Sequence, residues 1–163
     1  ASAALRTEML MLATQNDSGL VVDTRELERQ GTSFMIDTLV SLRHDNPQQS
    51  LLLIIGSDAF NHLTSWYQWQ HLFDIAHLVV LTRPGFIIQQ LENFFADKLT
   101  INKEALSEQL AGKLYFQPVT QLDISASKIR EMIANDRNPA FLLPDSVLGL
   151  IKQYHLYQLL LPT

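Results

Sequence analysis

The sequence contains no cysteine, and this absence excludes several kinds of chemistry. Without thiols the chain can form no disulfide, no thiolate zinc site and no cysteine nucleophile. It also lacks a long hydrophobic run, because the longest is LLLII at 51–55, whereas a membrane span needs roughly 18 apolar residues. We therefore expect a cytoplasmic protein without a membrane partner.

Glycine and basic residues are also scarce. The 6 glycines are too scattered to form a P-loop, a G-x-G-x-x-G motif or a G-x-S-x-G motif. Lysine and arginine number 12 against 17 acidic residues, a net charge of −5, which argues against a nucleic-acid partner. The 5 histidines show no metal-ligand spacing. The sequence thus predicts no metal site built from its own side chains and no covalent nucleophile.

What the chain does have is enough apolar sequence for one core. Its 163 residues are 47% hydrophobic and 18% charged, and a chain of this length buries roughly 70% of its unfolded surface. We see no internal repeat and no linker composition. The sequence therefore predicts a single domain over residues 1–163.

Helical and strand patterns alternate along this domain. Apolar runs predict strands at 20–23, 51–56, 77–85 (where the strand runs into a turn at Pro84 and Gly85) and 113–119. The runs at 51–56 and 77–85 are typical of strands buried on both faces. Helical spacing is found at 3–14, 32–45 (capped by Thr32 or Ser33), 66–76, 86–110 and in two carboxy-terminal segments opening at Ser125 and Pro144. This alternation predicts an α/β fold, a Rossmann-like doubly wound parallel sheet whose ligands bind beyond the carboxyl ends of the strands.

Polar residues follow the strand at 51–56. Gly56 permits close approach of a ligand to the backbone, and Asp58 supplies a carboxylate that can accept hydrogen bonds from ribose hydroxyls. Ser57 or Asp58 could instead cap the next helix. The sequence supports both interpretations.

A helix start and a second strand end carry further candidate binding residues. Trp66 and Tyr67 are predicted near the start of a helix, where the Trp66 indole could either join the core, as we expect of Trp69, or stack on a positively charged pyridinium ring. Arg83 ends the strand at 77–85, where it could bind phosphate or pair with an acidic side chain at the surface.

The segment ISASKIR at 124–130 is the strongest local signal. With Ser125 as N-cap, Ile124 and Ile129 occupy the positions of a hydrophobic staple. Ser127 and Arg130 then share one face near a positive helix end, which favours an anion. Plain capping is the alternative, but it leaves Arg130 unexplained.

Together these motifs closely resemble bacterial nicotinate-nucleotide adenylyltransferases of the nucleotidyltransferase superfamily. The resemblance covers nearly the whole chain and depends on Gly-x-Asp at 56–58, Ser-Trp-Tyr at 65–67, Arg-Pro-Gly at 83–85 and Ile-Ser-x-x-x-Ile-Arg at 124–130. Transferases of pantetheine phosphate share the last motif but lack the Trp-Tyr pair. The resemblance implies direct in-line transfer of AMP from ATP to nicotinate mononucleotide, usually with Mg²⁺, on the route to NAD.

The same resemblance implies a role for each candidate residue. Asp58 would bind ribose, Trp66 would stack on the nicotinate ring, the Tyr67 amide would bind the nicotinate carboxylate, and Arg83 would lie near the mononucleotide. The family's Ser-Tyr-Thr stretch reads Ser33, Phe34, Met35 here, so only a main-chain contact is available at Met35. The ATP phosphates would be held by Ser125, Ser127 and Arg130.

One family motif has no counterpart in the sequence. The family's Gly-Gly-x-Phe-Asp-Pro-x-His-x-Gly-His stretch, which supplies its catalytic histidines, is absent, so no catalytic residue is assigned. We expect an amino-terminally incomplete chain that lacks a first βα unit and is inactive alone. Other acceptors (nicotinamide mononucleotide or pantetheine phosphate) and a non-catalytic mononucleotide-binding fragment remain alternatives. The choice between monomer and homo-oligomer stays open.

Overall fold

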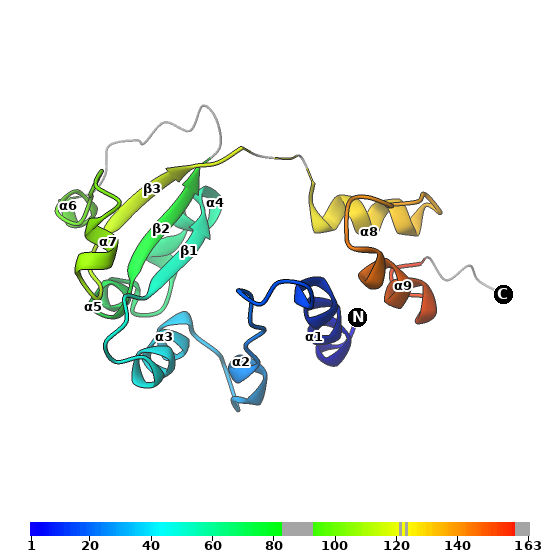
Figure 1. The fold of residues 1–163 in the computed structure, drawn as a ribbon, viewed down its shortest axis with the longest axis horizontal. Helices are drawn as coiled ribbons and strands as arrows, with labels where there is room; N and C mark the ends of the chain where they lie inside the picture. The colour runs from blue at the N-terminus through cyan, green and yellow to red at the C-terminus, as the bar shows by residue number, and fades with distance from the viewer. Residues whose placement is uncertain (83–92, 121, 123, 159–163) are drawn as a thin grey trace. The chain divides into compact units, whose positions relative to one another are not determined.

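The computed structural model describes residues 1–82, 93–120, 122 and 124–158 (Figure 1). The chain divides into two compact units, Arg29–Gln121 and a second one formed by Ala1–Glu28 with Leu122–Thr163. The larger unit contains the described β-sheet, and the described elements of the smaller unit are helices. The prediction of a single domain stays a prediction.

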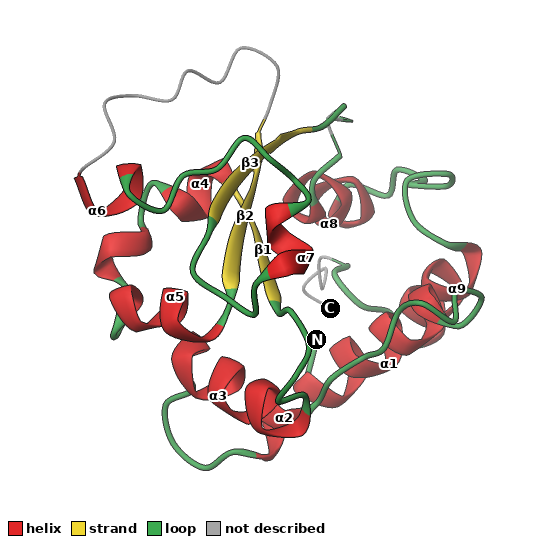
Figure 2. Ribbon diagram, turned by 60° about the vertical axis from the view of Figure 1, so that its left-hand side comes forward, coloured by secondary structure: helices red, strands yellow, loops and turns green. Residues whose placement is uncertain are grey.

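The sheet of the larger unit has three parallel strands in the order β1 (Leu52–Gly56), β2 (His77–Thr82), β3 (Leu114–Pro118). Figure 2 shows them side by side, and the register pairs Gly56 with Leu81 and Thr82 with Pro118. The strands predicted at 51–56 and 113–119 are confirmed over these bounds, and the one predicted at 77–85 is confirmed as far as Thr82, because residues 83–85 lie outside the described residues. Parallel pairing brings all three carboxyl ends to one edge of the sheet.

The strands differ in burial. The central strand β2 is buried on both faces, as predicted, whereas β1 is not: Leu52 is 46% exposed and Ile54 57%. The core cluster of the larger unit contacts Leu53 and Ile55, which alternate with the exposed pair and so face the other side. The prediction that β1 is buried on both faces is therefore wrong for the described structure.

Short helices connect the strands of the larger unit: α3 (Met35–Asp45), α4 (Ser57–Phe60), α5 (Leu72–Ile75), α6 (Asn93–Ala96), α7 (Ala105–Glu108) and the 3₁₀ turns η1 (Leu63–Ser65) and η2 (Trp69–His71). The helix predicted over 66–76 is wrong at its start, because Gln68 is left-handed (φ 53°) and interrupts it.

The helical prediction for 86–110 falls partly outside the described residues. From residue 93 onward it is wrong between α6 and α7, because Leu99 forms a parallel bridge with Leu114. The Thr100 amide donates to the Leu114 carbonyl over 2.9 Å, and the Leu114 amide donates to the Lys98 carbonyl over 2.8 Å. These long-range bonds hold the chain extended where its local pattern favours a helix.

The smaller unit contains α1 (Ala3–Thr14), α2 (Arg25–Glu28), α8 (Ala126–Ala134) and α9 (Asp145–Gln153). The helix predicted at 3–14 and both carboxy-terminal helices are confirmed. The Ser146 hydroxyl of α9 donates to the Leu12 carbonyl of α1 over 3.2 Å. No helix in the described ranges is long and apolar enough to cross a membrane.

The strand predicted at 20–23 is wrong. These residues form a loop, and Val21 is 88% exposed, because the described part of the smaller unit offers no strand with which they could pair. Asp23 instead organises the start of α2, where its carboxylate accepts hydrogen bonds from the Arg25 amide and guanidinium. The side-chain bond from Arg25, with the backbone bond second, holds the pKa of Asp23 below its usual value.

The Arg43 guanidinium binds four main-chain carbonyls at the amino-terminal side of the sheet. Nη1 donates to Asn46 (3.1 Å) and Gln49 (2.5 Å), and Nη2 donates to Ile75 (2.7 Å) and Leu110 (2.8 Å). A single partly buried side chain thus joins the ends of α3 and α5 to the segment that leads into β3.

His77 anchors the same segment from inside the sheet. Its side chain is fully buried, and Nε2 lies 2.9 Å from the Gln109 carbonyl while Nδ1 accepts the Lys113 amide over 3.0 Å. Since a carbonyl only accepts, Nε2 carries the proton in this arrangement. Arg43 and His77 together fix the loop 109–113 that precedes β3.

Replacing glycine with alanine is expected to change the stability in opposite directions at two positions. Gly112, in the loop 109–113, has φ +98°, so Gly112→Ala is expected to cost about 1 kcal/mol of stability. Gly149 is an exposed interior residue of α9 whose added Cβ would meet nothing within 4 Å, so Gly149→Ala should stabilise by up to about 1 kcal/mol. Urea unfolding followed by circular dichroism measures both; shifts in the same direction would contradict this assignment.

Candidate active site

The end of β1 leads directly into α4. Gly56 is the N-cap of α4, and no side chain caps the helix, so the interpretation of Ser57 or Asp58 as a cap is wrong. A Cβ added at Gly56 would meet nothing within 4 Å, which leaves room for close approach of a ligand. Asp58 lies in the first turn of α4 with its side chain exposed. This edge of the sheet therefore presents a carboxylate beside an open stretch of backbone.

The two tryptophans have different surroundings. Trp69 contacts the rings of Phe94 (centroids 4.9 Å apart) and Phe95 (5.2 Å), so its predicted place in the core is confirmed. Trp66 packs against the same core but stays partly exposed. Packing and exposure together leave both interpretations of Trp66 compatible with the structure.

The start of α3 is not capped as predicted. Phe34 is the N-cap residue and makes no side-chain cap bond, so the prediction of Thr32 or Ser33 as the cap is wrong. The Ser33 hydroxyl instead accepts a hydrogen bond from Arg29 Nη1 over 2.9 Å. Within the described residues, no acceptor is bonded to the first two helical amides, those of Met35 and Ile36. Two main-chain donors at the positive end of an eleven-residue helix are thus available to an anion.

Sequence reasoning missed the side-chain contact between Phe34 and Tyr67. Their ring centroids lie 4.5 Å apart with the planes tilted by 35°, although Phe34 is 36% exposed and Tyr67 53%. The contact joins the start of α3 to the turn that carries Trp66. Neither helical nor strand periodicity links residues this far apart in the chain, so no sequence pattern could have revealed it.

The remaining residue predicted for this edge, Arg83, lies outside the described residues, so its role stays a prediction. Thr82, the last residue of β2, borders a cavity of about 330 Å³ with Pro118 at the end of β3. The other residues that line this cavity are Leu99, Thr100, Ile101, Tyr115 and Phe116. It contains none of the predicted binding residues.

In the smaller unit, the predicted start of α8 is confirmed. Ser125 is the N-cap, and its hydroxyl accepts the Lys128 amide over 3.2 Å. Arg130 Nη2 donates to the Ser127 hydroxyl over 3.2 Å, and Arg130 Nε donates to the Ala126 carbonyl over 3.2 Å. Ser127 and Arg130 therefore share one exposed face of the first turn, as predicted. The staple between Ile124 and Ile129 stays a prediction.

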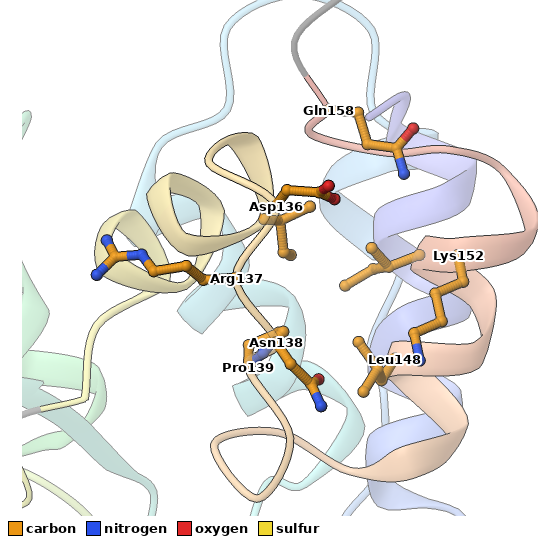
Figure 3. A pocket seen from close by; sticks show the side chains of 9 residues that line it. Asp136, Arg137, Asn138, Pro139, Leu148, Lys152 and Gln158 are labelled. Carbon is orange, nitrogen blue, oxygen red and sulfur yellow. The ribbon is translucent and has the colours of Figure 1, made fainter.

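A pocket of about 210 Å³ lies at the opposite end of α8, between its last turn and α9 (Figure 3). Its apolar part is formed by Ile133, Pro139, Leu148 and Ile151, and its polar part by Asp136, Arg137, Asn138, Lys152 and Gln158. None of the predicted binding residues lines it. In the described parts of the chain, no group of three or more histidine, aspartate or glutamate side chains is placed to hold a metal ion.

Comparison with known proteins decides the family. Residues 1–132 match the Cytidylyltransferase-like family. A probable nicotinate-nucleotide adenylyltransferase from Methylococcus capsulatus is 42% identical over 156 residues, which cover 93% of this chain and 74% of that protein. One from Marinomonas sp. is 40% identical over 157 residues, covering 94% and 71%. The chain belongs to the nicotinate-nucleotide adenylyltransferase family.

Solved structures agree with this membership at the level of the fold. The nicotinic acid mononucleotide adenylyltransferase of Plasmodium falciparum complexed with APC superposes with a TM-score of 0.66 at 16% identity, covering 96% of this chain and 76% of that one. Its complex with NaAD gives a TM-score of 0.65 at 17% identity. The predicted α/β class and Rossmann-like parallel sheet are confirmed, and the resemblance seen in the sequence is that of a nicotinate-nucleotide adenylyltransferase.

Proposed function

We propose that the protein transfers the adenylyl group of ATP to nicotinate mononucleotide, giving nicotinate adenine dinucleotide and pyrophosphate. The observation that carries the proposal is the 42% identity to a probable nicotinate-nucleotide adenylyltransferase across 93% of the chain. In the reaction, a phosphate oxygen of the mononucleotide attacks the α-phosphorus of ATP. The bond from that phosphorus to the bridging oxygen breaks, and pyrophosphate leaves with the electron pair.

Such a transfer depends on position and charge rather than on an enzyme nucleophile. Both phosphate groups are anionic, so the protein must hold them in line while it offsets their mutual repulsion. Main-chain amides, an arginine and hydroxyls meet this need without forming a covalent intermediate. The absence of cysteine in the sequence and of any nucleophile motif is consistent with direct transfer.

We place the nicotinate group of the acceptor at the start of α3. Its carboxylate would accept hydrogen bonds from the Met35 and Tyr67 amides. Within the described residues, neither amide is bonded to a main-chain carbonyl, and no side chain caps α3. A main-chain contact needs no hydroxyl, so methionine at position 35 is compatible with this role. Ser33 would shape the site through its bond to Arg29. The Trp66 indole would stack on the pyridinium ring, and the attraction of a cation to an aromatic face supports this placement.

The ribose and phosphate of the acceptor would bind at the carboxyl edge of the sheet. The exposed Asp58 carboxylate would accept bonds from the ribose hydroxyls, beside the open backbone at Gly56. Arg83, in the residues that directly follow β2, would donate to the mononucleotide phosphate.

The ATP phosphates would bind at the start of α8. Ser125 fixes the helix end, and Ser127 and Arg130 present a hydroxyl and a guanidinium on one face of it. A helix start alone gains only about 0.3–1 kcal/mol from a nearby negative charge. Charge-assisted bonds from arginine are roughly twice as strong as neutral ones, so Arg130 makes the site suitable for a triphosphate.

Mg²⁺ would accompany ATP rather than occupy a site made by the protein. The described residues contain no cluster of metal-binding side chains, and Mg²⁺ commonly binds through substrate phosphates and water. Bound in this way, the ion neutralises part of the phosphate charge. We further propose that the protein works in the cytoplasm, which suits a chain without cysteine.

Acceptor competition tests the proposal. We expect the protein, expressed from its complete reading frame, to release pyrophosphate from ATP with kcat/KM about 100-fold higher for nicotinate mononucleotide than for nicotinamide mononucleotide. An uncharged amide group cannot replace a carboxylate between two N–H donors. Equal or higher kcat/KM with nicotinamide mononucleotide or with pantetheine phosphate would overturn the assignment. Quenching of tryptophan fluorescence by the mononucleotide, without any transfer, would identify a binding module.

A further inference from the structure

We propose that Phe34 is a positioning residue that sets the preference of the acceptor site for an acid over an amide. The inference rests on the proposed function and adds to it a residue that touches neither substrate's reacting atoms. It depends on two features of Phe34. Its ring contacts Tyr67, and it occupies the N-cap position of α3 although its side chain has no hydrogen-bond acceptor.

The first feature is the ring contact. The Phe34 and Tyr67 rings lie 4.5 Å apart at a tilt of 35°, a separation at which aromatic pairs attract by about 0.5–1.5 kcal/mol beyond the area they bury. Tyr67 lies in a turn next to the left-handed residue Gln68, and its hydroxyl accepts a bond from the Gln68 side chain over 3.2 Å. Those contacts are local in the chain. The ring of Phe34 contacts this turn directly from the start of α3, in addition to the packing of Met35 and Trp66 on the common core.

The second feature is the missing cap. Serine, threonine, asparagine or aspartate at an N-cap position would bond the amides of the first turn, and a phenyl ring cannot. Phe34 therefore leaves the Ile36 amide without a side-chain cap, and its ring at the same time contacts the side chain of Tyr67, the residue to which the proposed function assigns the second donor. One side chain thus exposes the donors from α3 and positions the donor from the turn.

Acceptor selectivity follows from this arrangement. A carboxylate between two convergent N–H groups accepts two charge-assisted bonds, whereas a carboxamide places its own N–H₂ against one donor. If the turn that carries Tyr67 moves away from the start of α3, a bound carboxylate loses one hydrogen bond. A bound carboxamide loses only an unfavourable contact between two N–H groups. Removing the Phe34 ring should therefore weaken binding of the acid and narrow its advantage over the amide.

Steady-state kinetics of Phe34→Ala in the protein from its complete reading frame test the inference. We expect KM for nicotinate mononucleotide to rise about tenfold, the acid-to-amide ratio of kcat/KM to fall about tenfold, and KM for ATP to change less than about twofold. Phe34→Tyr keeps the ring and should restore all three values. Phe141→Ala removes an equally large ring that is 98% exposed, and it should leave the kinetics unchanged.

A second variant separates positioning from folding. Phe34→Ser removes the ring but introduces a good N-cap, so KM for the acceptor should rise although α3 becomes no less stable. Unchanged KM and selectivity in both Phe34→Ala and Phe34→Ser would overturn the inference. Absence of any transfer to nicotinate mononucleotide by the unsubstituted protein would instead refute the proposed function.

Discussion

Replacing Arg43 with alanine is expected to lower the free energy of unfolding of the larger unit by about 3 kcal/mol. The substitution removes the guanidinium donors from four main-chain carbonyls in three segments, those of Asn46, Gln49, Ile75 and Leu110. Two of these bonds are partly buried, so water replaces them poorly. Both tryptophans lie in this unit, and urea unfolding followed by their fluorescence measures the loss.

Two matched variants show whether geometry or charge carries the effect. Arg43→Lys keeps the charge but offers its donors from one nitrogen, so it should recover less than half of the loss. Lys103→Ala removes an exposed cation from the same unit and should change stability by no more than about 0.5 kcal/mol. Equal stability of Arg43→Ala and the unsubstituted protein would mean that water satisfies the four carbonyls.

The second large effect is expected on catalysis. Arg130→Ala should reduce kcat/KM for ATP by about 100-fold, as is typical when one charged donor to a reacting anion is removed. Either a higher KM for ATP or a lower kcat would account for the loss. Arg130 is exposed on α8, so the unfolding midpoint should stay within experimental error of the original. Initial rates of pyrophosphate release at varied ATP measure the first quantity and circular dichroism the second.

The neighbouring side chains supply the controls for that result. Ser127→Ala removes a neutral partner and should cost less than about tenfold, since neutral bonds are roughly half as strong as charge-assisted ones. Arg130→Lys keeps the charge without the fork and should fall between the two. If Arg130→Ala leaves the kinetics unaltered, the ISASKIR segment at 124–130 caps a helix and does not bind the ATP phosphates.

Features set by neighbours in the chain could be predicted from the sequence. The apolar runs of β1, β2 and β3 are confirmed, and so is the Ser125 cap of α8, because a cap bond spans only three residues. The pairing of Ser127 with Arg130 is likewise a single-turn relation. The family was also recognisable, because its motifs are short and local.

Features set by distant partners could not be predicted. The helical pattern at 86–110 is interrupted because Leu99 pairs with Leu114. The segment 20–23 has the composition of a strand, yet a strand needs a partner and the described part of its unit provides none. The contact of Phe34 with Tyr67 depends on the path of the whole chain between them. In each case a bond or contact outside the local window decides the outcome.

The uncapped start of α3 has a consequence for how the acceptor would be bound. A helix whose N-cap is phenylalanine lacks the oxygen that ordinarily completes its first turn. A carboxylate bound at this end would supply an acceptor for amides that the helix leaves unbonded. Binding of the acceptor would then also stabilise the first turn of α3.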